Sequence, residues 1–224
     1  MKLHVFDSCP FCVRVKAVIG LKGIECEISP MLLGELPASL EGKFERFTVP
    51  VLETVDPKSG NVSVMAESLD IIRKLDQLNV PMFDHYEVSE KLESRLAQLK
   101  PVTAQLLYPR MPKLNLPELS GASALNAFTE SRKEVLGQSI EEALEKTEHY
   151  LPQLEEQLAL MEQELDVEAF VLGRRNLNID DIAAFAELRN FTMIAELTLS
   201  KYMRTYIDLI SSRTNVATYP PIGK

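Results

Sequence analysis

The feature that most constrains this chain is a Cys-Pro-Phe-Cys motif at residues 9–12, close to its start. Residues 3–6 before the motif are rich in strand-forming side chains, and residues 13–23 after it carry apolar side chains at helical spacing. The motif therefore occupies a strand-to-helix turn. This arrangement predicts that Cys9 lies in the turn itself and that Cys12 lies in the first turn of an amphipathic helix.

A cysteine at the start of a helix is chemically distinctive because the first backbone N–H groups of a helix have no partner within it. Together with the helix dipole they stabilise a thiolate, and the pKa of such a thiol falls from about 8.5 to roughly 3.5–7.5. We therefore expect Cys9 to be a nucleophile and Cys12, deeper in the helix, to be the resolving thiol. Arg14 and Lys16 place positive charge one turn away, and Arg14 is the candidate for tuning the Cys9 pKa.

Two structural roles compete with this redox interpretation. Cys9, Cys12, Cys26 and His4 could form a zinc site, but one CxxC pair without a second pair lacks the usual spacing of zinc ligands. A permanent disulfide is disfavoured because three cysteines in 224 residues are few and odd in number, which is typical of a reducing compartment. We therefore expect no metal and no structural disulfide.

The composition bounds the class of partner. The formal charge is −9, of which residues 1–75 carry −1 and residues 76–224 carry −8, so nucleic acid and anionic membranes are unsuitable as main partners. The nearly neutral first part does not repel an anionic small substrate. No apolar run reaches the roughly 18 residues needed to span a bilayer, and the apolar stretch at the start is too short for a signal peptide. We expect a cytoplasmic location.

The segment after the first helix predicts a βαβ unit. Gly20 or Gly23 can end the helix, and residues 24–28 then alternate apolar and polar side chains, which predicts a half-buried strand. Such a strand pairs in parallel with the first one. Cys26 lies on the apolar side of the alternation, so we expect it to be a small buried hydrophobic residue. Residues 29–47 are irregular, with a possible short helix over 36–44.

Pro50 stands at the start of a predicted strand, a position that suits either a cis Val49-Pro50 bond or a trans proline at the first strand residue. A cis bond would leave the Val49 backbone N–H and C=O free to pair with an extended peptide. Residues 51–55 and 61–65 predict a hairpin around a turn at residues 56–60.

The segment from Glu67 to Leu75 predicts a further helix, with Ser68 as its N-cap. The same unpartnered N–H groups could hold a substrate carboxylate, and Glu67 could accept a hydrogen bond from an ammonium group. The two interpretations are compatible, and both stay open at this point.

Beyond residue 75 the pattern becomes helical. Residues 76–86 lack periodicity, which predicts a linker between a first domain of residues 1–75 and an all-helical domain of residues 87–224. Asn178 and Asp181 form a capping box before a central helix. We expect helices at 89–107, kinked or broken at Pro101, at 139–164, interrupted at Pro152, at 179–188 and at 201–211, with 123–135 ambiguous and a docked or loose tail at 218–224.

Residues 1–75 thus have the order β-α-β-α-β-β-α, with Cys-Pro-x-Cys at the first helix, Val-Pro before the third strand and Glu-Ser at the last helix. This set resembles the glutaredoxin branch of the thioredoxin fold, and the helical part resembles the C-terminal domain of glutathione transferases. The chain is similar to the two-domain bacterial glutaredoxin 2 family, in the segments Gly20-Leu21-Lys22, Val49-Pro50, 67–71, 180–182 and Leu188-Arg189-Asn190. The expected fold class is an α/β thioredoxin-like domain followed by an all-α glutathione-transferase-like domain.

The resemblance implies glutathione-dependent thiol–disulfide exchange, with Cys9 and Cys12 as the catalytic pair and glutathione as the reductant. It also implies that Glu67 and Ser68 hold the γ-glutamyl end of glutathione. The Val49 backbone, presented by Pro50, would then pair with its cysteine moiety. Lys22 is a weaker candidate for a glutathione carboxylate. One departure is Phe11 where tyrosine is usual, which removes a hydroxyl beside the sulfurs.

Two alternatives of other classes share this architecture. One is a cysteine-type glutathione transferase or dehydroascorbate reductase, although such enzymes often lack the second cysteine that is present here as Cys12. The other is a non-catalytic interaction module of the glutathione-transferase type. The expected partners are glutathione and glutathionylated or disulfide-containing proteins, and we expect the chain to act as a monomer.

Overall fold

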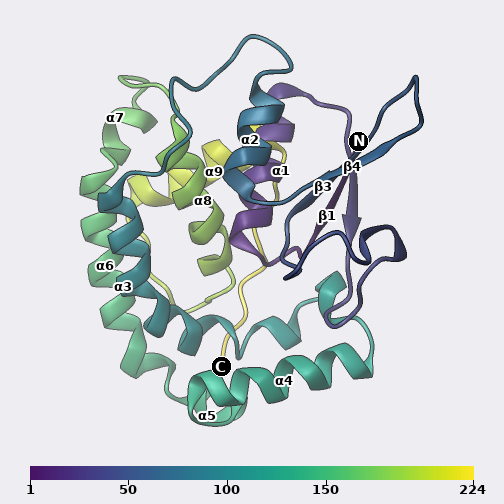
Figure 1. Ribbon diagram of the computed structural model, residues 1–224. Helices are drawn as coiled ribbons and strands as arrows, with labels where there is room; N and C mark the ends of the chain where they lie inside the picture. Colours follow the sequence, from purple (N-terminus) through teal and green to yellow (C-terminus); the bar gives the residue numbers. More distant parts are fainter.

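A four-stranded mixed sheet forms the first part of the molecule. The computed structural model describes all of residues 1–224, and its sheet has the strand order β2-β1-β3-β4 (Figure 1). β1 pairs in parallel with β2 and antiparallel with β3, which pairs antiparallel with β4. The strands are β1 (Lys2–Val5), β2 (Glu27–Pro30), β3 (Val51–Val55) and β4 (Val62–Met65). The parallel pair and the hairpin are both confirmed.

Two helices, α1 (Pro10–Lys22) and α2 (Ser68–Asp76), lie side by side between the sheet and the helical part (Figure 1). With them the sheet forms the expected thioredoxin-like fold, except that the helix expected near residues 36–44 is only a 3-10 turn, η1 (Ala38–Leu40). The second strand also starts later than expected, because the chain needs residues 24–26 to return from α1 to the edge of β1. Cys26 therefore lies before β2 and is only half-buried.

Seven helices make up the second part of the chain. They are α3 (Glu90–Leu107), α4 (Ala122–Leu136), α5 (Ile140–Glu145), α6 (Thr147–Glu164), α7 (Val167–Val171), α8 (Ile179–Phe191) and α9 (Lys201–Thr214), with two 3-10 turns, η2 (Met111–Lys113) and η3 (Pro117–Leu119), between α3 and α4. An all-helical second part is confirmed. None of these helices combines the length and the apolar character that crossing a bilayer requires.

The two prolines expected to interrupt helices do not end them. α3 continues through Pro101 and α6 through Pro152, so the expected break at Pro152 is wrong. Each proline frees the carbonyl four residues earlier, and the residues concerned, Ala97 and Glu148, are exposed, so water can satisfy those carbonyls. The break falls instead at Lys146, between α5 and α6.

α8 is the central helix of the second part, as expected. Its capping box is confirmed, because the Asn178 side chain accepts a hydrogen bond from the Asp181 N–H at 3.0 Å and the Asn178 N–H donates to the Asp181 carboxylate at 2.9 Å. The C-terminal tail is docked, since Ile222 forms a β-bridge with Ile194. One hydrophobic cluster of 49 buried residues runs through both parts of the molecule.

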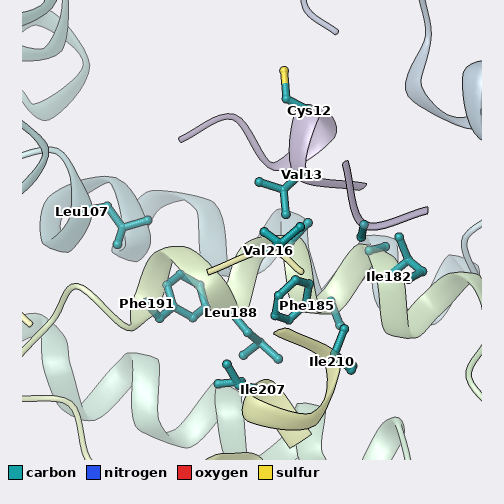
Figure 2. Close-up of a cluster of buried hydrophobic side chains, with 14 of the residues drawn as sticks. Cys12, Val13, Leu107, Ile182, Phe185, Leu188, Phe191, Ile207, Ile210 and Val216 are labelled. Atoms are coloured by element: carbon teal, nitrogen blue, oxygen red, sulfur yellow. The ribbon is translucent and has the colours of Figure 1, made fainter. Parts of the chain in front are cut away.

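α1 is not amphipathic, contrary to expectation, because both of its faces are covered. Figure 2 shows Val13 pointing from α1 toward Val216 and Phe185, while the sulfur of Cys12 points away from that cluster. Val15 and Val18 are also fully buried, and α1 packs against α2 as well as α8 and α9. The helix that carries the motif is therefore the shared core element of the two parts.

Gly20 explains how closely α1 and α9 approach. A Cβ atom at Gly20 would lie 1.7 Å from the backbone carbonyl oxygen of Thr214, at the end of α9. Gly20 lies inside α1, whereas Gly23 adopts the left-handed conformation, with φ of 58°, and ends the helix. The sequence allowed either glycine to end α1, and the structure assigns them different roles.

We expect Gly20→Ala to destabilise the protein by about 2–3 kcal/mol, because the added methyl group must push α1 and α9 apart. The usual gain of about 1 kcal/mol from replacing a helical glycine by alanine opposes this loss and does not offset it. Urea unfolding measures the difference, with Gly223→Ala as a control, since a Cβ there meets only a glutamate oxygen at 3.7 Å. Equal stability of the two variants would contradict this close approach.

Candidate active site

Three chain segments meet at one edge of the sheet. The register pairs His4 with Val51 and Leu52 with Met65, so the end of β1, the start of β3 and the end of β4 lie at the same edge. The motif follows β1, the Val49-Pro50 segment precedes β3, and Glu67-Ser68 follows β4. The structure therefore brings these three predicted site segments to one side of the sheet, on adjacent strands that are about 4.8 Å apart.

Cys9 is the N-cap residue of α1 and is half-buried, whereas the Cys12 side chain is completely buried in the first turn. The Val49-Pro50 bond is cis, and the Cys9 Sγ lies 3.9 Å from the Val49 carbonyl oxygen. Both expected positions of the cysteines are thus confirmed, and an extended backbone segment lies directly beside the more accessible sulfur.

The surroundings separate the acidities of the two thiols. A hydrogen bond from the Cys12 thiol is the main cause that lowers the pKa of Cys9, and the backbone N–H groups of Cys12 and Phe11 lower it further, against the opposing effects of burial and of Glu187. Burial raises the pKa of Cys12 far above its usual value. At neutral pH the arrangement therefore favours a thiolate at Cys9 and a neutral thiol at Cys12.

The two basic residues after the motif differ in their contacts. The Arg14 guanidinium is buried and stacks on the Phe11 ring at 4.7 Å, and Cys9 is among the groups that raise the pKa of Arg14 against burial. Lys16 pairs with Asp7 at 2.7 Å, and its charge acts on Cys12, whose pKa it lowers against burial. Arg14 is therefore the basic side chain that lies near Cys9. Its effect on the Cys9 pKa is smaller than the effects of the Cys12 thiol and the backbone amides.

The loop just before Cys9 is held by side chains from the helical part. Glu118, next to α4, accepts hydrogen bonds from the backbone N–H groups of Asp7 and Ser8 at 3.0 and 2.8 Å and from the Ser8 hydroxyl at 2.6 Å. Asn190 of α8 donates its side-chain amide to the Ser8 carbonyl at 2.8 Å. These contacts determine the direction in which the chain enters α1.

Asp7 is the centre of the same attachment. Its carboxylate accepts hydrogen bonds from Lys16 at 2.7 Å, from Arg189 at 2.8 Å and from the Tyr219 hydroxyl at 2.7 Å. Burial alone would raise the pKa of Asp7, but the charges of Arg189 and Lys16 outweigh it and hold that pKa well below its usual value. The carboxylate is therefore ionised throughout the physiological range, and it ties α1, α8 and the tail together.

The start of α2 differs from the expected cap. Glu67 is the N-cap residue, with a left-handed φ of 66°, while Ser68 is the first helical residue, and no side chain caps the helix. The prediction of Ser68 as N-cap is therefore wrong. The helix begins one residue earlier than expected, so the Ser68 hydroxyl does not accept a hydrogen bond from the N–H groups of the first turn. Glu67 is exposed and Ser68 is buried. The first turn of α2 thus keeps its N–H groups free of side-chain acceptors.

Lys22 is not brought to this site. Its ammonium group lies at the other end of α1, where it pairs with the buried Asp76 carboxylate at 2.8 Å and also donates to the carbonyl oxygens of Asp76 and Val80. With 3% of its side chain exposed it has no accessible charge for a ligand. Since α1 separates it from Cys9 by 13 residues, or about 20 Å along the helix, Lys22 serves the packing of the segment after α2.

No group of three or more histidine, cysteine, aspartate or glutamate side chains is arranged to hold a metal ion. His4 contacts Glu53 at 3.2 Å rather than a cysteine, and Cys26 lies before β2, apart from the motif. The structure therefore does not assemble the four-residue zinc site that the sequence left open.

A cleft of about 600 Å³ opens beside Cys9, between α1 and the helical part. Phe11 and Arg14 line one wall, and residues of α3, α4 and α8 line the others. The Phe11 side chain is 50% exposed at this place. Val49, Pro50, Glu67 and Ser68 do not line the cleft, so the sulfur of Cys9 borders two separate regions.

Fold and site together define a class of protein: a thioredoxin-fold part with a dithiol at the start of its first helix, joined to a helical part of the glutathione-transferase type. Two family descriptions agree with this class, since residues 3–81 match "Glutathione S-transferase, N-terminal domain" and residues 91–222 match "Glutaredoxin 2, C terminal domain". The second match spans more than half of the chain.

The chain belongs to the glutaredoxin 2 family. It is 27% identical to Glutaredoxin 2 of Escherichia coli K12 over 218 residues, which is 96% of each chain. Glutaredoxins are glutathione-dependent thiol–disulfide oxidoreductases, and this chain is an enzyme of that class.

Solved structures show the same fold. Glutaredoxin 2 from Salmonella typhimurium, determined in complex with glutathione, superposes with a TM-score of 0.80 at 24% identity and covers 97% of this chain and 95% of its own. FzlA from C. crescentus has a TM-score of 0.53 at 16% identity, covering 99% of this chain and 94% of its own. The two-part architecture is therefore common to proteins with little sequence in common.

Local sequence patterns indicate no role for several residues that the structure places at the site. Glu118, Arg189 and Tyr219 hold the loop before Cys9, and Glu187 lines the cleft. Arg189 and Asn190 were visible only as part of a segment that matches the family. Their function depends on contacts with residues more than 180 positions away, which no local pattern reveals.

We expect Cys12→Ala to raise the pKa of Cys9, because the substitution removes the thiol whose hydrogen bond is the main cause of its lowered value. The rate of Cys9 alkylation by iodoacetamide, measured against pH, should then show a midpoint at higher pH. All variants carry Cys26→Ser, so that Cys9 reports alone.

Cys12→Ser is the matched control, since its hydroxyl can still donate a hydrogen bond to the Cys9 sulfur, and its midpoint should move less. If the alanine variant keeps the original midpoint, the backbone amides alone stabilise the thiolate.

We expect Asp7→Asn to destabilise the protein at pH 7 by about 3 kcal/mol, because it leaves the buried Arg189 without its carboxylate. The folded-state pKa of Asp7 is lowered, so its contribution is complete above the unfolded pKa of about 3.9 and is lost as pH falls through the folded value. The stability difference between wild type and variant should therefore shrink as urea unfolding is repeated from pH 6 toward pH 2. Asp208→Asn, at an exposed position of α9, is the control; a difference that is independent of pH would exclude this role of Asp7.

Proposed function

We propose that Cys9 is the nucleophile of glutathione-dependent disulfide exchange in this protein and that Cys12 is its resolving thiol. One observation carries the proposal: the Cys9 sulfur lies half-buried at the start of α1, with a lowered pKa, 3.9 Å from the Val49 carbonyl oxygen. A thiolate held by unpartnered helix amides beside a half-buried extended backbone segment is suited to attack a disulfide in an extended peptide.

Glutathione fits the edge of the sheet described above. The Val49 backbone, next to the cis Pro50, can pair with the cysteine moiety of glutathione and place its sulfur beside Cys9. The uncapped first turn of α2 at Ser68 can receive the γ-glutamyl carboxylate, and the exposed Glu67 carboxylate can accept a hydrogen bond from the neighbouring ammonium group. These residues come from adjacent strands, which matches the length of an extended tripeptide.

The proposed reaction on a protein–glutathione mixed disulfide has two steps. The Cys9 thiolate attacks the glutathione sulfur, a Cys9–glutathione disulfide forms, and the protein thiolate leaves and takes up a proton. The thiolate of a second glutathione then attacks this disulfide, releasing oxidised glutathione and the Cys9 thiolate. In the net reaction the substrate cysteine is reduced to a thiol and the free glutathione is oxidised, while the glutathione from the mixed disulfide leaves as the other half of oxidised glutathione.

For a protein disulfide, the exchange needs Cys12. Cys9 first forms a mixed disulfide with the substrate, and the Cys12 sulfur then attacks Cys9, releasing the substrate dithiol and leaving a Cys9–Cys12 disulfide for two glutathiones to reduce. Because burial raises the pKa of Cys12, its thiol must lose its proton during the attack, and the departing substrate thiolate is a suitable acceptor.

We also propose that the enzyme acts as a monomer in a reducing, cytoplasmic compartment on glutathionylated and disulfide-containing proteins. Both parts of one chain line the cleft beside Cys9, which supports a site that is complete without a second copy. The three free cysteines support a reducing compartment. The division into residues 1–75, a linker at 76–86 and residues 87–224 stays a prediction, supported by the irregular chain between α2 and α3.

We expect Cys9→Ser to abolish turnover of a glutathionylated peptide, because the hydroxyl that replaces the thiol is not ionised at neutral pH. Cys12→Ser should keep this turnover and lose the reduction of a peptide disulfide, which needs the second thiol. Formation of oxidised glutathione, coupled to glutathione reductase, measures both reactions.

Conjugation of glutathione to an electrophile, assayed in parallel, separates this activity from that of a transferase. A Cys9→Ser variant as active as the wild type would refute the proposal.

A further inference from the structure

The cleft beside Cys9 contains a buried cation without an acceptor. Arg14 is 7% exposed, and its Nε atom is buried with no hydrogen-bond partner. None of its nitrogen atoms forms an ion pair; the group stacks only on the Phe11 ring, at 4.7 Å. A buried charge without hydrogen-bond partners is costly, so an incoming acceptor at this place gains more than it would in water.

A second unsatisfied group borders the same cleft. Asn190 is 2% exposed, and although its amide nitrogen donates to the Ser8 carbonyl, its Oδ1 atom has no donor. Two residues that line the cleft thus each carry a buried polar atom without a hydrogen-bond partner, a donor on Arg14 and an acceptor on Asn190, among mostly apolar side chains. A peptide segment offers both complementary groups, since each residue carries an N–H and a C=O.

The charges around Arg14 leave its guanidinium available. Glu187 and Glu93 line the cleft and act on Arg14 through space, but neither forms an ion pair with it. Burial raises the pKa of Glu187, and the charges of Arg14 and Lys100 oppose this effect. Lys100 and Arg132 add positive charge to the cleft walls. Three positive side chains of the cleft thus face three carboxylates, Glu118 included, so the feature that favours an incoming carboxylate is the missing hydrogen-bond partner of Arg14 and not the net charge.

We propose that this cleft binds the polypeptide side of the mixed disulfide and that Arg14 selects substrates with an acidic residue next to the modified cysteine. The inference rests on the proposed function, in which glutathione occupies the separate region at Val49, Glu67 and Ser68. During the exchange the Cys9–glutathione bond forms while the bond from glutathione to the substrate cysteine breaks, and the leaving thiolate belongs to the polypeptide held here. The exposed Phe11 ring supplies an apolar contact at the mouth of the cleft.

The test compares two glutathionylated peptides that differ only in glutamate or glutamine beside the cysteine. We expect the wild-type kcat/KM to favour the acidic peptide by about tenfold, the scale of one charge-assisted hydrogen bond. Arg14→Gln should bring the ratio close to one. Because each ratio compares two substrates on one enzyme variant, changes in the nucleophilicity of Cys9 cancel.

Two further variants sharpen the comparison. Glu187→Gln removes the carboxylate that acts most strongly on Arg14 and should increase the preference for the acidic peptide. Arg174→Gln, exposed and outside the cleft, removes the same charge as Arg14→Gln and should leave the ratio at its wild-type value. If Arg14→Gln does not fold, an unchanged or smaller ratio in Glu187→Gln overturns the inference.

A substrate without a polypeptide separates the proposed function from the inference about the cleft. The mixed disulfide of glutathione and 2-mercaptoethanol requires only the proposed function, so a wild-type enzyme inactive on it contradicts that function. Activity on this disulfide, combined with equal kcat/KM values for the two peptides or with a preference that persists in Arg14→Gln, overturns the inference about the cleft alone.

Discussion

The rest of this structure depends on the attachment of residues Asp7 and Ser8 to the helical part. Carboxylate, guanidinium, amide and phenol groups from three separate elements saturate the polar groups of these two residues. The next residue is the Cys9 thiol, so the direction in which its sulfur leaves the chain is determined from outside the thioredoxin-like part. A local motif thereby acquires a rigid position, which exchange between sulfur atoms requires.

Beyond this attachment, the two parts of the chain share one continuous hydrophobic core. α1 is buried on both faces, and at Gly20 its backbone touches the end of α9 without any side chain between them. A single hydrophobic cluster continues from the sheet through α1 into α8 and α9. The helical part is therefore a structural support of the active-site helix, and it also provides the far wall of the cleft beside Cys9.

Two chemically identical thiols acquire different acidities through burial and hydrogen bonding. Burial raises the pKa of both sulfurs, but at Cys9 the Cys12 thiol and two backbone amides donate hydrogen bonds that outweigh it. Cys12 lies fully inside the core, where burial dominates. Cys9 therefore favours the ionised, attacking form and Cys12 the neutral, resolving form. This difference follows from their spacing of three positions at the start of the helix and from the burial of each side chain.

The sequence by itself determined the local elements and the motif that carries the chemistry: the strand-to-helix turn, the positions of Cys9 and Cys12, the hairpin and the capping box before α8 follow from patterns within about ten residues. It could not show that Ser68 is the first helical residue of α2 and not its N-cap, or that Lys22 forms a buried ion pair with Asp76. Only the tertiary structure decided which charges meet, because Glu118, Arg189 and Tyr219 reach the loop before Cys9 from positions more than 100 residues away. Hydrogen bonding and packing at such separations leave no periodic trace in the sequence, whereas helix starts and strand alternation do.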